Sequence, residues 1–294
     1  GQLNFLDATG SVTTTYEAGD VLQLRVSDLD RNSDAAVAES ISVLLTSTTE
    51  DTGTPASVTD PVAGSSNVGD GTVVVTTRGI ETTSEDWELT AVSQTSFLVT
   101  GSVSGTQQTL NVGADYETDG GEIGIRIDQG SLSFSVGDKY TFTSTAAEVV
   151  GETITLTETD LDSGVFLASV TLNETSEAIN GNGELELVPG DRITAFYDDP
   201  QGDFGDPELS RHFALYAKTV LGGTTILADT VWTKESSPYL LTGDVTITEG
   251  VTLSLLEGVE VLFLANSDDQ SSGQRIGDAE LLVNGSLNAA GSAE

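Results

Sequence analysis

Apolar and polar residues alternate along much of this chain, with the period of two that a half-buried β-strand requires. In the clearest run, Leu22, Leu24 and Val26 share one face of the expected strand, while Gln23 and Arg25 share the other. The same period recurs in four later runs: Ile123, Ile125 and Ile127; Leu132, Phe134 and Val136; Ile154 and Leu156; Leu185 and Leu187. Thr and Val dominate these runs, and both suit a pleated, half-buried surface. The sequence therefore predicts an all-β protein.

Only two segments have any helical character. Residues 33–40 are rich in Ala but short, and residues 206–213 could begin a helix. The second segment fits a strand equally well, with Phe213, Leu215 and Ala217 on one face. Both interpretations of that segment stay open.

A Gly-Asp pair comes just before an expected strand at four places in the chain. The pairs are Gly19-Asp20, Gly137-Asp138, Gly190-Asp191 and Gly243-Asp244. Glycine accepts the positive φ of a turn, and we expect each aspartate to bond the backbone amides that follow it. No Gly-Lys-Ser/Thr sequence follows any pair, so the pairs indicate a structural repeat and not a phosphate-binding loop.

The charge of the chain limits its partners. With 47 acidic against 10 basic residues, the formal net charge is −37. This charge rules out nucleic acid as a natural partner, since phosphate binding needs clustered Lys and Arg. It also argues against binding to an anionic membrane. No apolar run approaches the roughly 20 residues that span a bilayer, so we expect no membrane insertion. Cysteine is absent, which excludes disulfides and thiolate metal sites. Because methionine is absent as well, even at position 1, we expect the chain to be a segment of a longer polypeptide.

An acidic stretch after the first clear strand has the spacing of a calcium loop. Asp28, Asp30, Asn32, Asp34 and Glu39 occupy positions 1, 3, 5, 7 and 12 of a twelve-residue frame. The loop follows a strand and lacks the glycine that an EF-hand has at its sharp turn, so we do not expect an EF-hand. The sequence predicts a Ca²⁺ site on a β-sheet. A solvated acidic turn is the alternative, because Asp, Asn and Ser favour turns in any context.

A second acidic cluster lies further along, at an expected domain junction. It contains Asp198, Asp199, Asp203 and Asp206. Carboxylates on both sides of a junction can bind Ca²⁺ and convert a flexible linker into a rigid one. An ordinary solvated linker rich in Pro and Gly is the alternative.

Four stretches of the chain, 1–27, 41–47, 152–166 and 183–199, form a recognisable set. Together they resemble an immunoglobulin-like β-sandwich module of large bacterial and archaeal surface proteins. Such modules recur in S-layer proteins, giant adhesins and extracellular fibre subunits. The resemblance implies an architecture and leaves the function open.

This sequence departs from the family pattern by a long insertion. In such modules the strand at 41–47 would run almost directly into the strand at 152–166. The resemblance therefore implies a discontinuous sandwich, 1–57 plus 148–217, with a second β-domain, 58–147, inserted into one loop. Sandwich loops tolerate insertions when the ends of the loop lie close together.

The last part of the chain, 218–294, changes character. Residues 248–253 and 256–261 repeat with a period of eight, and 281–287 follows with similar short strands and turns. Together with Trp232, this pattern resembles the first rung of a right-handed parallel β-helix, in which short strands stack on one another. The alternative is one more sandwich domain with glycine turns.

These features favour an extracellular structural protein at the cell surface. We expect a repeat-type subunit of a surface layer, filament or adhesin, stabilised by Ca²⁺ and associating with copies of itself or with neighbouring repeats of a parent chain. The alternative is a carbohydrate-binding or carbohydrate-cleaving surface module, which would need a cleft lined by aromatic and acidic side chains. We expect no enzyme activity. No Gly-x-Ser-x-Gly motif accompanies the single histidine, His212, and Trp87 and Trp232 are expected in cores or interfaces.

Overall fold

The computed structural model describes residues 1–202, 208–268, 270 and 273–289. Two of the predicted calcium ligands, Asp203 and Asp206, lie outside these residues. Within them the regular structure is β-strand, apart from two short 3₁₀ helices, η1 (Gly79–Glu81) and η2 (Lys234–Ser236). The prediction of an all-β protein is therefore confirmed. No helix in the described part of the chain is long and apolar enough to cross a lipid bilayer.

The chain forms two compact units. Unit 1 contains residues 1–52 and 150–294, and unit 2 contains residues 53–149. The predicted insertion, 58–147, falls inside unit 2. The sequence separated 218–294 from the outer sandwich, whereas the contacts group these residues with unit 1.

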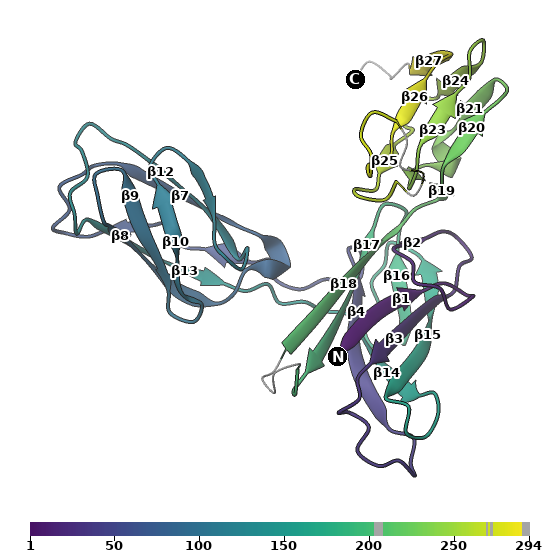
Figure 1. Cartoon of the computed structure of the whole chain (residues 1–294), viewed down its shortest axis with the longest axis horizontal. Helices are drawn as coiled ribbons and strands as arrows, with labels where there is room; N and C mark the ends of the chain where they lie inside the picture. Colours follow the sequence, from purple (N-terminus) through teal and green to yellow (C-terminus); the bar gives the residue numbers. More distant parts are fainter. Residues whose placement is uncertain (203–207, 269, 271–272, 290–294) are drawn as a thin grey trace. The chain divides into compact units, whose positions relative to one another are not determined.

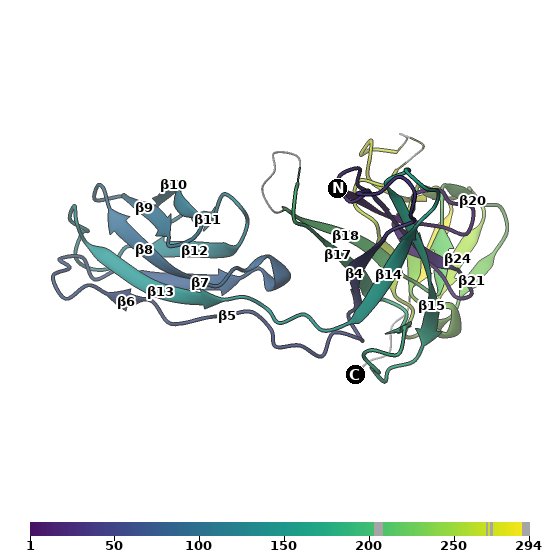
Figure 2. The same ribbon diagram turned by 90° about the horizontal axis from the view of Figure 1, so that it is seen from below.

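A nine-stranded sheet forms the first part of unit 1. Eight strands follow the order β1-β3-β15-β14-β4-β17-β18-β2, and the ninth, β16, pairs with β15. The strands are β1 (Gln2–Leu6), β2 (Thr15–Tyr16), β3 (Leu22–Ser27), β4 (Ser40–Ser47), β14 (Glu152–Glu158), β15 (Val165–Glu174), β16 (Glu184–Leu187), β17 (Arg192–Asp199) and β18 (Glu208–Tyr216). Strands β4 and β14 lie side by side although unit 2 separates them in the sequence, and Glu152 pairs with Leu45 (Figure 2).

The core of this sheet is built by the alternation seen in the sequence. Leu22, Leu24 and Val26 are fully buried, as are Leu185 and Leu187. They belong to one cluster with residues from the other long strands of the sheet. Strand residues one step out of register face away from this cluster, so the period of two fixes which side chains are buried.

The two segments with helical character are not helices. Residues 33–39 form turns and irregular loop, with Ser40 starting β4, and the described residues 208–213 belong to β18. The strand interpretation of this segment is therefore correct for residues 208–216, and the buried side chains belong to the opposite face from Phe213. Ala214 and Tyr216 point into the core, whereas Phe213 is 39% exposed. His212 pairs with Ala195 of β17 within the sheet.

Three of the four Gly-Asp pairs close the same kind of turn. Gly19, Gly137 and Gly190 have positive φ angles of 93°, 96° and 105°. The carboxylate of the aspartate that follows each one accepts the backbone N–H of the residue three positions before it: Glu17, Ser135 or Val188. The expectation that these aspartates bond the following amides was wrong, because the tight turn brings the preceding amide to the carboxylate. Asp244 of the fourth pair accepts the N–H of Glu280 instead.

Unit 2 has a six-stranded and a three-stranded sheet around a core of its own. The strands are β5 (Ser57–Val58), β6 (Val62–Ala63), β7 (Thr72–Thr77), β8 (Glu85–Ala91), β9 (Ser96–Gly101), β10 (Gly105–Asn111), β11 (Asp115–Glu117), β12 (Ile123–Asp128) and β13 (Lys139–Thr145). Trp87 stacks on Phe142, with ring centroids 6.3 Å apart. The strand predicted at Leu132, Phe134 and Val136 was wrong, because this segment is irregular. Phe134 alone enters the core, and Leu132 and Val136 are 55% and 75% exposed.

Short parallel strands make up the rest of unit 1. They are β19 (Thr219–Leu221), β20 (Thr224–Ile226), β21 (Thr230–Trp232), β22 (Tyr239–Leu241), β23 (Val245–Ile247), β24 (Thr252–Leu255), β25 (Val261–Phe263), β26 (Leu281–Val283) and β27 (Ser286–Ala289). They form three sheets, β19-β22-β25, β20-β23-β26 and β21-β24-β27, and the chain visits the sheets in turn (Figure 1).

The true repeat of this region is a full circuit of the three sheets, not eight residues. Thr219, Tyr239 and Val261 stack in register in one sheet. The two segments of the predicted eight-residue repeat lead into β24 and β25, which belong to different sheets. The interior is a separate cluster that includes Trp232 and Tyr239, whose rings stack with centroids 4.4 Å apart.

Candidate metal centre

Strand alternation carries two aspartates to the inner side of the unit 1 sheet. In β3, Leu24 and Val26 are buried, and Asp28 takes the next inward position just after the strand ends. In β17, Tyr197 is buried, and Asp199 follows two residues later on the same face. Asp28 and Asp199 are only 4% and 1% exposed. Buried carboxylates at the end of an apolar core need a partner, because desolvation of an isolated charge is costly.

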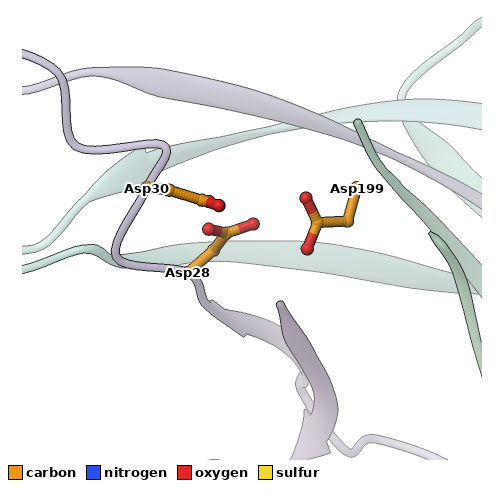
Figure 3. A group of neighbouring side chains, drawn as sticks. All are labelled: Asp28, Asp30 and Asp199. Atoms are coloured by element: carbon orange, nitrogen blue, oxygen red, sulfur yellow. The ribbon is translucent and has the colours of Figure 1, made fainter. Parts of the chain in front are cut away.

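Asp30 completes an acidic triad with these two residues. One carboxylate oxygen from each of Asp28, Asp30 and Asp199 lies within 4.8 Å of the others. Figure 3 shows the three carboxyl groups facing a common region, Asp28 and Asp30 from the loop after β3 and Asp199 from the end of β17. The structure thus joins members of two clusters that the sequence placed in separate sites.

Neighbouring groups hold the carboxylates in place. The hydroxyl of Tyr197 donates a hydrogen bond of 2.5 Å to Asp28, and the backbone N–H of Gln201 donates one of 3.0 Å to Asp199. These contacts fix the direction in which the remaining oxygens point.

The pKa values of Asp28 and Asp30 are shifted in opposite directions. Burial raises the pKa of Asp28, but the hydrogen bonds with Asp30 and Tyr197 outweigh burial and hold it below its usual value. The pKa of Asp30 is raised, first by its hydrogen bond with Asp28 and then by burial and the charges of Asp28 and Asp199. Without a cation, the triad therefore favours retaining a proton on Asp30.

The geometry of the triad fits a hard cation. Two oxygens on opposite sides of a Ca²⁺ are about 4.6–5.2 Å apart, because each bond is about 2.3–2.6 Å long. Oxygens within 4.8 Å of one another can therefore share one coordination sphere. Asp28 and Asp30 also line an open pocket of about 610 Å³ together with Gln2 and Gln201, which leaves room for further oxygen ligands and water.

The rest of the predicted calcium loop has other roles. One oxygen of Glu39 accepts hydrogen bonds from the Ser33 N–H at 2.7 Å, the Ser33 hydroxyl at 2.6 Å and the Asp34 N–H at 2.8 Å. Asp34 in turn accepts the N–H of Ala36 at 3.0 Å. Glu39 therefore organises the loop from within, and these hydrogen bonds lower its pKa. The structure does not bring Asp34 or Glu39 into the acidic triad.

Asn32 turns toward a different part of the chain. Its side-chain N–H donates to Asp162 at 2.9 Å. Its Oδ1 is buried without a hydrogen-bond donor, as is Oε2 of Glu39. Glu39 also meets Glu158, whose Oε2 lies 3.4 Å from the Glu39 backbone nitrogen. Neither Asn32 nor Glu39 therefore joins the acidic triad.

The predicted junction cluster is divided by strand alternation. Asp198 lies between Tyr197 and Asp199 in β17, so it faces outward and is exposed. Asp199 faces inward and joins the triad. Sequence reasoning missed Tyr197, although its place two residues before Asp199 was a usable signal for a shared face.

Comparisons with known proteins add little to this geometry. No protein-family model matches the chain, and no curated protein matches it. Two crystal structures of Xanthomonas campestris FlgL, in space groups H3 and C2, show 16% sequence identity and a TM-score of 0.25. The matches span 33% and 34% of this chain, and 31% and 33% of the FlgL chains. A likeness this weak carries no argument about fold or function.

Proposed function

We propose that this protein is an extracellular structural protein, a repeat-type subunit of a cell-surface layer or fibre, stabilised by Ca²⁺ at the acidic triad. The observation that carries the proposal is the meeting of Asp28, Asp30 and Asp199 around one point. A cation there would tie the loop after β3 to the end of β17. Because it would bind only the folded chain, its binding free energy would add to the free energy of unfolding.

The net charge of the chain supports a role for divalent cations. A formal charge of −37 opposes the compact state by self-repulsion. Calcium-binding modules outside the cell work with Kd values of about 10⁻⁴–10⁻³ M. A triad that binds Ca²⁺ in that range would be filled outside the cell and would lower the repulsion at the point where carboxylates are densest.

The finer architecture is also a proposal. We infer an immunoglobulin-like sandwich interrupted by unit 2, followed by a parallel β-helix. The order of the nine-stranded sheet and its insertion between β4 and β14 support the first part. The three sheets of stacked parallel strands support the second.

The strands at one end of the parallel stack support self-association. Among the described strands, β25, β26 and β27 each pair on one side only. Phe263 and Val283 on these strands are 50% and 45% exposed. Unpaired strand edges accept strands from another chain. A contact of this kind with a different surface of the next copy does not close, and it would build a filament.

The alternative of a carbohydrate module has less support. Sugar binding commonly uses aromatic faces that are open to solvent. Trp87 and Trp232, the two tryptophans of the chain, are only 1% and 5% exposed and lie in two different cores. Neither offers a stacking surface.

Calorimetric titration with CaCl₂ tests the proposed site directly. The wild-type protein should bind Ca²⁺, and the variant Asp28→Asn/Asp199→Asn should lose the triad-dependent binding. Asp198→Asn, which removes one carboxylate from the outer face of β17, should keep it. Absence of binding by the wild type in millimolar Ca²⁺ would contradict the proposal. Electron microscopy of the same samples would then show whether Ca²⁺ produces polymers.

A further inference from the structure

A second carboxylate group in unit 1 is buried more deeply than the triad. Glu50 lies in the turn after β4, and Glu186 lies in β16. Both side chains are fully buried, with 0% exposure, and Glu152 at the start of β14 is nearly so. Two carboxylates cannot both stay ionised side by side in such a place without a compensating charge or proton.

The surroundings of Glu186 favour its ionised form. Its Oε1 accepts the side-chain N–H groups of Asn182 at 2.9 Å and Asn173 at 3.2 Å. Its Oε2 accepts the backbone N–H of Ile179 at 3.1 Å. Three amide donors on one carboxylate stabilise the negative charge. Burial raises the pKa of Glu186, but the hydrogen bonds with Asn182, Glu50, Ile179 and Asn173 outweigh burial and lower it.

The surroundings of Glu50 favour its neutral form. Its Oε2 accepts the backbone N–H of Glu186 at 3.1 Å. Its Oε1 is buried and has no hydrogen-bond donor. Burial and the contact with Glu186 raise the pKa of Glu50 to about 7. A buried oxygen with no donor, beside an ionised carboxylate, fits a hydroxyl group that donates to that carboxylate.

A bound metal ion is a poorer explanation than a proton. Ca²⁺ needs six to eight oxygen ligands. The oxygens of Glu152 already accept the backbone N–H groups of Gly181, Asn182 and Gly183. Asn182 turns a positively polarised N–H group toward Glu186. Of the oxygens in these three carboxylates, Glu50 Oε1 alone lacks a donor, and one vacant acceptor fits one proton.

We propose that Glu50 and Glu186 share a single proton, carried by Glu50, and that its loss loosens the turn through which the chain passes from β4 to unit 2. The turn is tied to this pair at several points. The backbone N–H of Glu50 donates to the Ser47 hydroxyl at 2.8 Å, and that hydroxyl donates to the carbonyl of Glu186. The next residue, Asp51, accepts the N–H of Val150 at 3.0 Å, at the point where the chain returns from unit 2.

Several acidic side chains lie around the turn. The basic residue Arg192 also meets the turn, through backbone hydrogen bonds with Thr48, but its guanidinium lies over the ring of Phe213. Glu186 from β16 and Glu152 from β14 face Glu50 and raise its pKa. Asp191, the residue directly before β17, accepts the N–H of Thr49 at 3.2 Å. Ionisation of Glu50 would therefore add a charge to a site that is already negative.

The sign of the pH effect follows from the direction of the shift. The pKa of Glu50 rises from 4.5 to about 7 on folding, so the folded chain holds a proton that the unfolded chain releases between these values. The contribution is fully present below the unfolded value and is lost as pH rises toward the folded value. This trend is opposite to that of an ordinary ion-paired carboxylate.

Glu50→Gln provides the central test, because its side-chain amide can donate to Glu186 at every pH. Between pH 5 and pH 8, the folding equilibrium constant of the wild type should fall relative to that of Glu50→Gln by about tenfold to a hundredfold. Glu186→Gln should be less stable than the wild type at both pH values, because one of its acceptor oxygens becomes a donor facing amide N–H groups. A wild type and Glu50→Gln that respond equally to pH would overturn the proposal.

Infrared spectroscopy gives a readout that does not depend on stability. At pH 6 the wild type should show the C=O stretch of a protonated carboxylic acid that the Glu50→Gln spectrum lacks. A wild-type spectrum without such a band would overturn the proposal. So would a stabilisation by CaCl₂ that persists in Asp28→Asn/Asp199→Asn and disappears when Glu50→Gln is added, because that result would mean a cation site at Glu50.

Discussion

The hydroxyl of Tyr197 donates a 2.5 Å hydrogen bond to the carboxylate of Asp28, which lies 169 positions earlier in the chain. Both side chains lie on the buried face of the nine-stranded sheet, and Tyr197 and Asp28 are only 1% and 4% exposed. The contact joins the end of β3 to β17 and directs Asp28 toward Asp30 and Asp199. Tyr197 therefore has two roles, since its ring fills the core and its hydroxyl positions a carboxylate of the triad.

Tyr197→Phe should separate these roles. The ring stays in the core, while Asp28 loses its buried donor. A hydrogen bond to a charged group contributes about 1.5–3 kcal/mol, so urea denaturation in the presence of EGTA should show a loss of that size. Tyr16→Phe is the matched control, because its hydroxyl bonds the neutral carbonyl of Leu6 at 2.8 Å and should contribute about 0.5–1.5 kcal/mol. Equal effects of the two variants would count against a positioning role for Tyr197.

The same contact should make metal-free unit 1 sensitive to acid. The pKa of Asp28 is lowered in the folded chain, since the hydrogen bonds with Asp30 and Tyr197 outweigh the effect of burial. Its contribution to stability is present above the unfolded value of 3.8 and is lost as pH falls through the folded value. Asp28→Asn should therefore lose less stability than the wild type when EGTA-treated samples are taken from pH 5 to pH 3. Parallel pH profiles for the two proteins would contradict this prediction.

Strand alternation is the part of the fold that the sequence predicts well. The runs at Leu22–Val26 and at Ile123, Ile125 and Ile127 are buried as expected, because a one-residue slip would expose every apolar side chain. The strand predicted from Leu132, Phe134 and Val136 was wrong, since this alternation occurs in an irregular segment that buries only Phe134. The same alternation of three apolar residues occurs in strands and in this loop, which anchors one aromatic ring, so the pattern alone does not separate the two.

The candidate site was only half predictable. Asp28 and Asp30 follow a clear strand with metal-ligand spacing, so they could be found from local sequence. Asp199 was assigned to another site, because its contact with Asp28 depends on how strands far apart in the sequence are arranged. Glu39 has calcium-loop spacing, but one oxygen of its carboxylate accepts backbone N–H groups of its own loop and the residue does not join the triad. Spacing alone does not show whether an oxygen is already used.

Calcium should raise the melting temperature of the protein through the triad. A ligand at a hundredfold excess over its Kd adds about 2.7 kcal/mol to the free energy of unfolding. We expect a higher melting midpoint in CaCl₂ than in EGTA for the wild type and for Asp198→Asn, and a much smaller difference for Asp199→Asn. NaCl at equal ionic strength should not reproduce the effect, because screening supplies no coordination. A midpoint in EGTA equal to that in CaCl₂ would rule out stabilisation by this site.

Unit 2 should be removable without loss of the outer sheet. Asp51 accepts the N–H of Val150 at 3.0 Å, so the two ends of the excised segment are already close together. Replacing residues 53–149 with a short glycine linker should leave β4 and β14 paired, and the product should melt in a single cooperative transition by circular dichroism. Expressed alone, residues 53–149 should fold with Trp87 buried, as tryptophan fluorescence would report. An unfolded outer chain after excision would mean that the two units depend on each other for folding.

Copies of the protein should assemble through the outer strands of the parallel stack. Strands β25, β26 and β27 are the outer members of their sheets among the described strands, and Val283 of β26 is 45% exposed. Repulsion between copies that each carry a net charge of −37 should keep them apart at low ionic strength, so polymers should form only with millimolar Ca²⁺ or high salt.

Val283→Lys places a charge on the edge strand and should abolish polymers seen by light scattering and electron microscopy. Leu227→Lys adds the same charge at an exposed position outside these strands and should assemble normally. If the two variants assemble equally well, the contact between copies does not use β26. A wild type that stays monomeric under all these conditions would favour a surface protein whose neighbouring repeats lie within one chain.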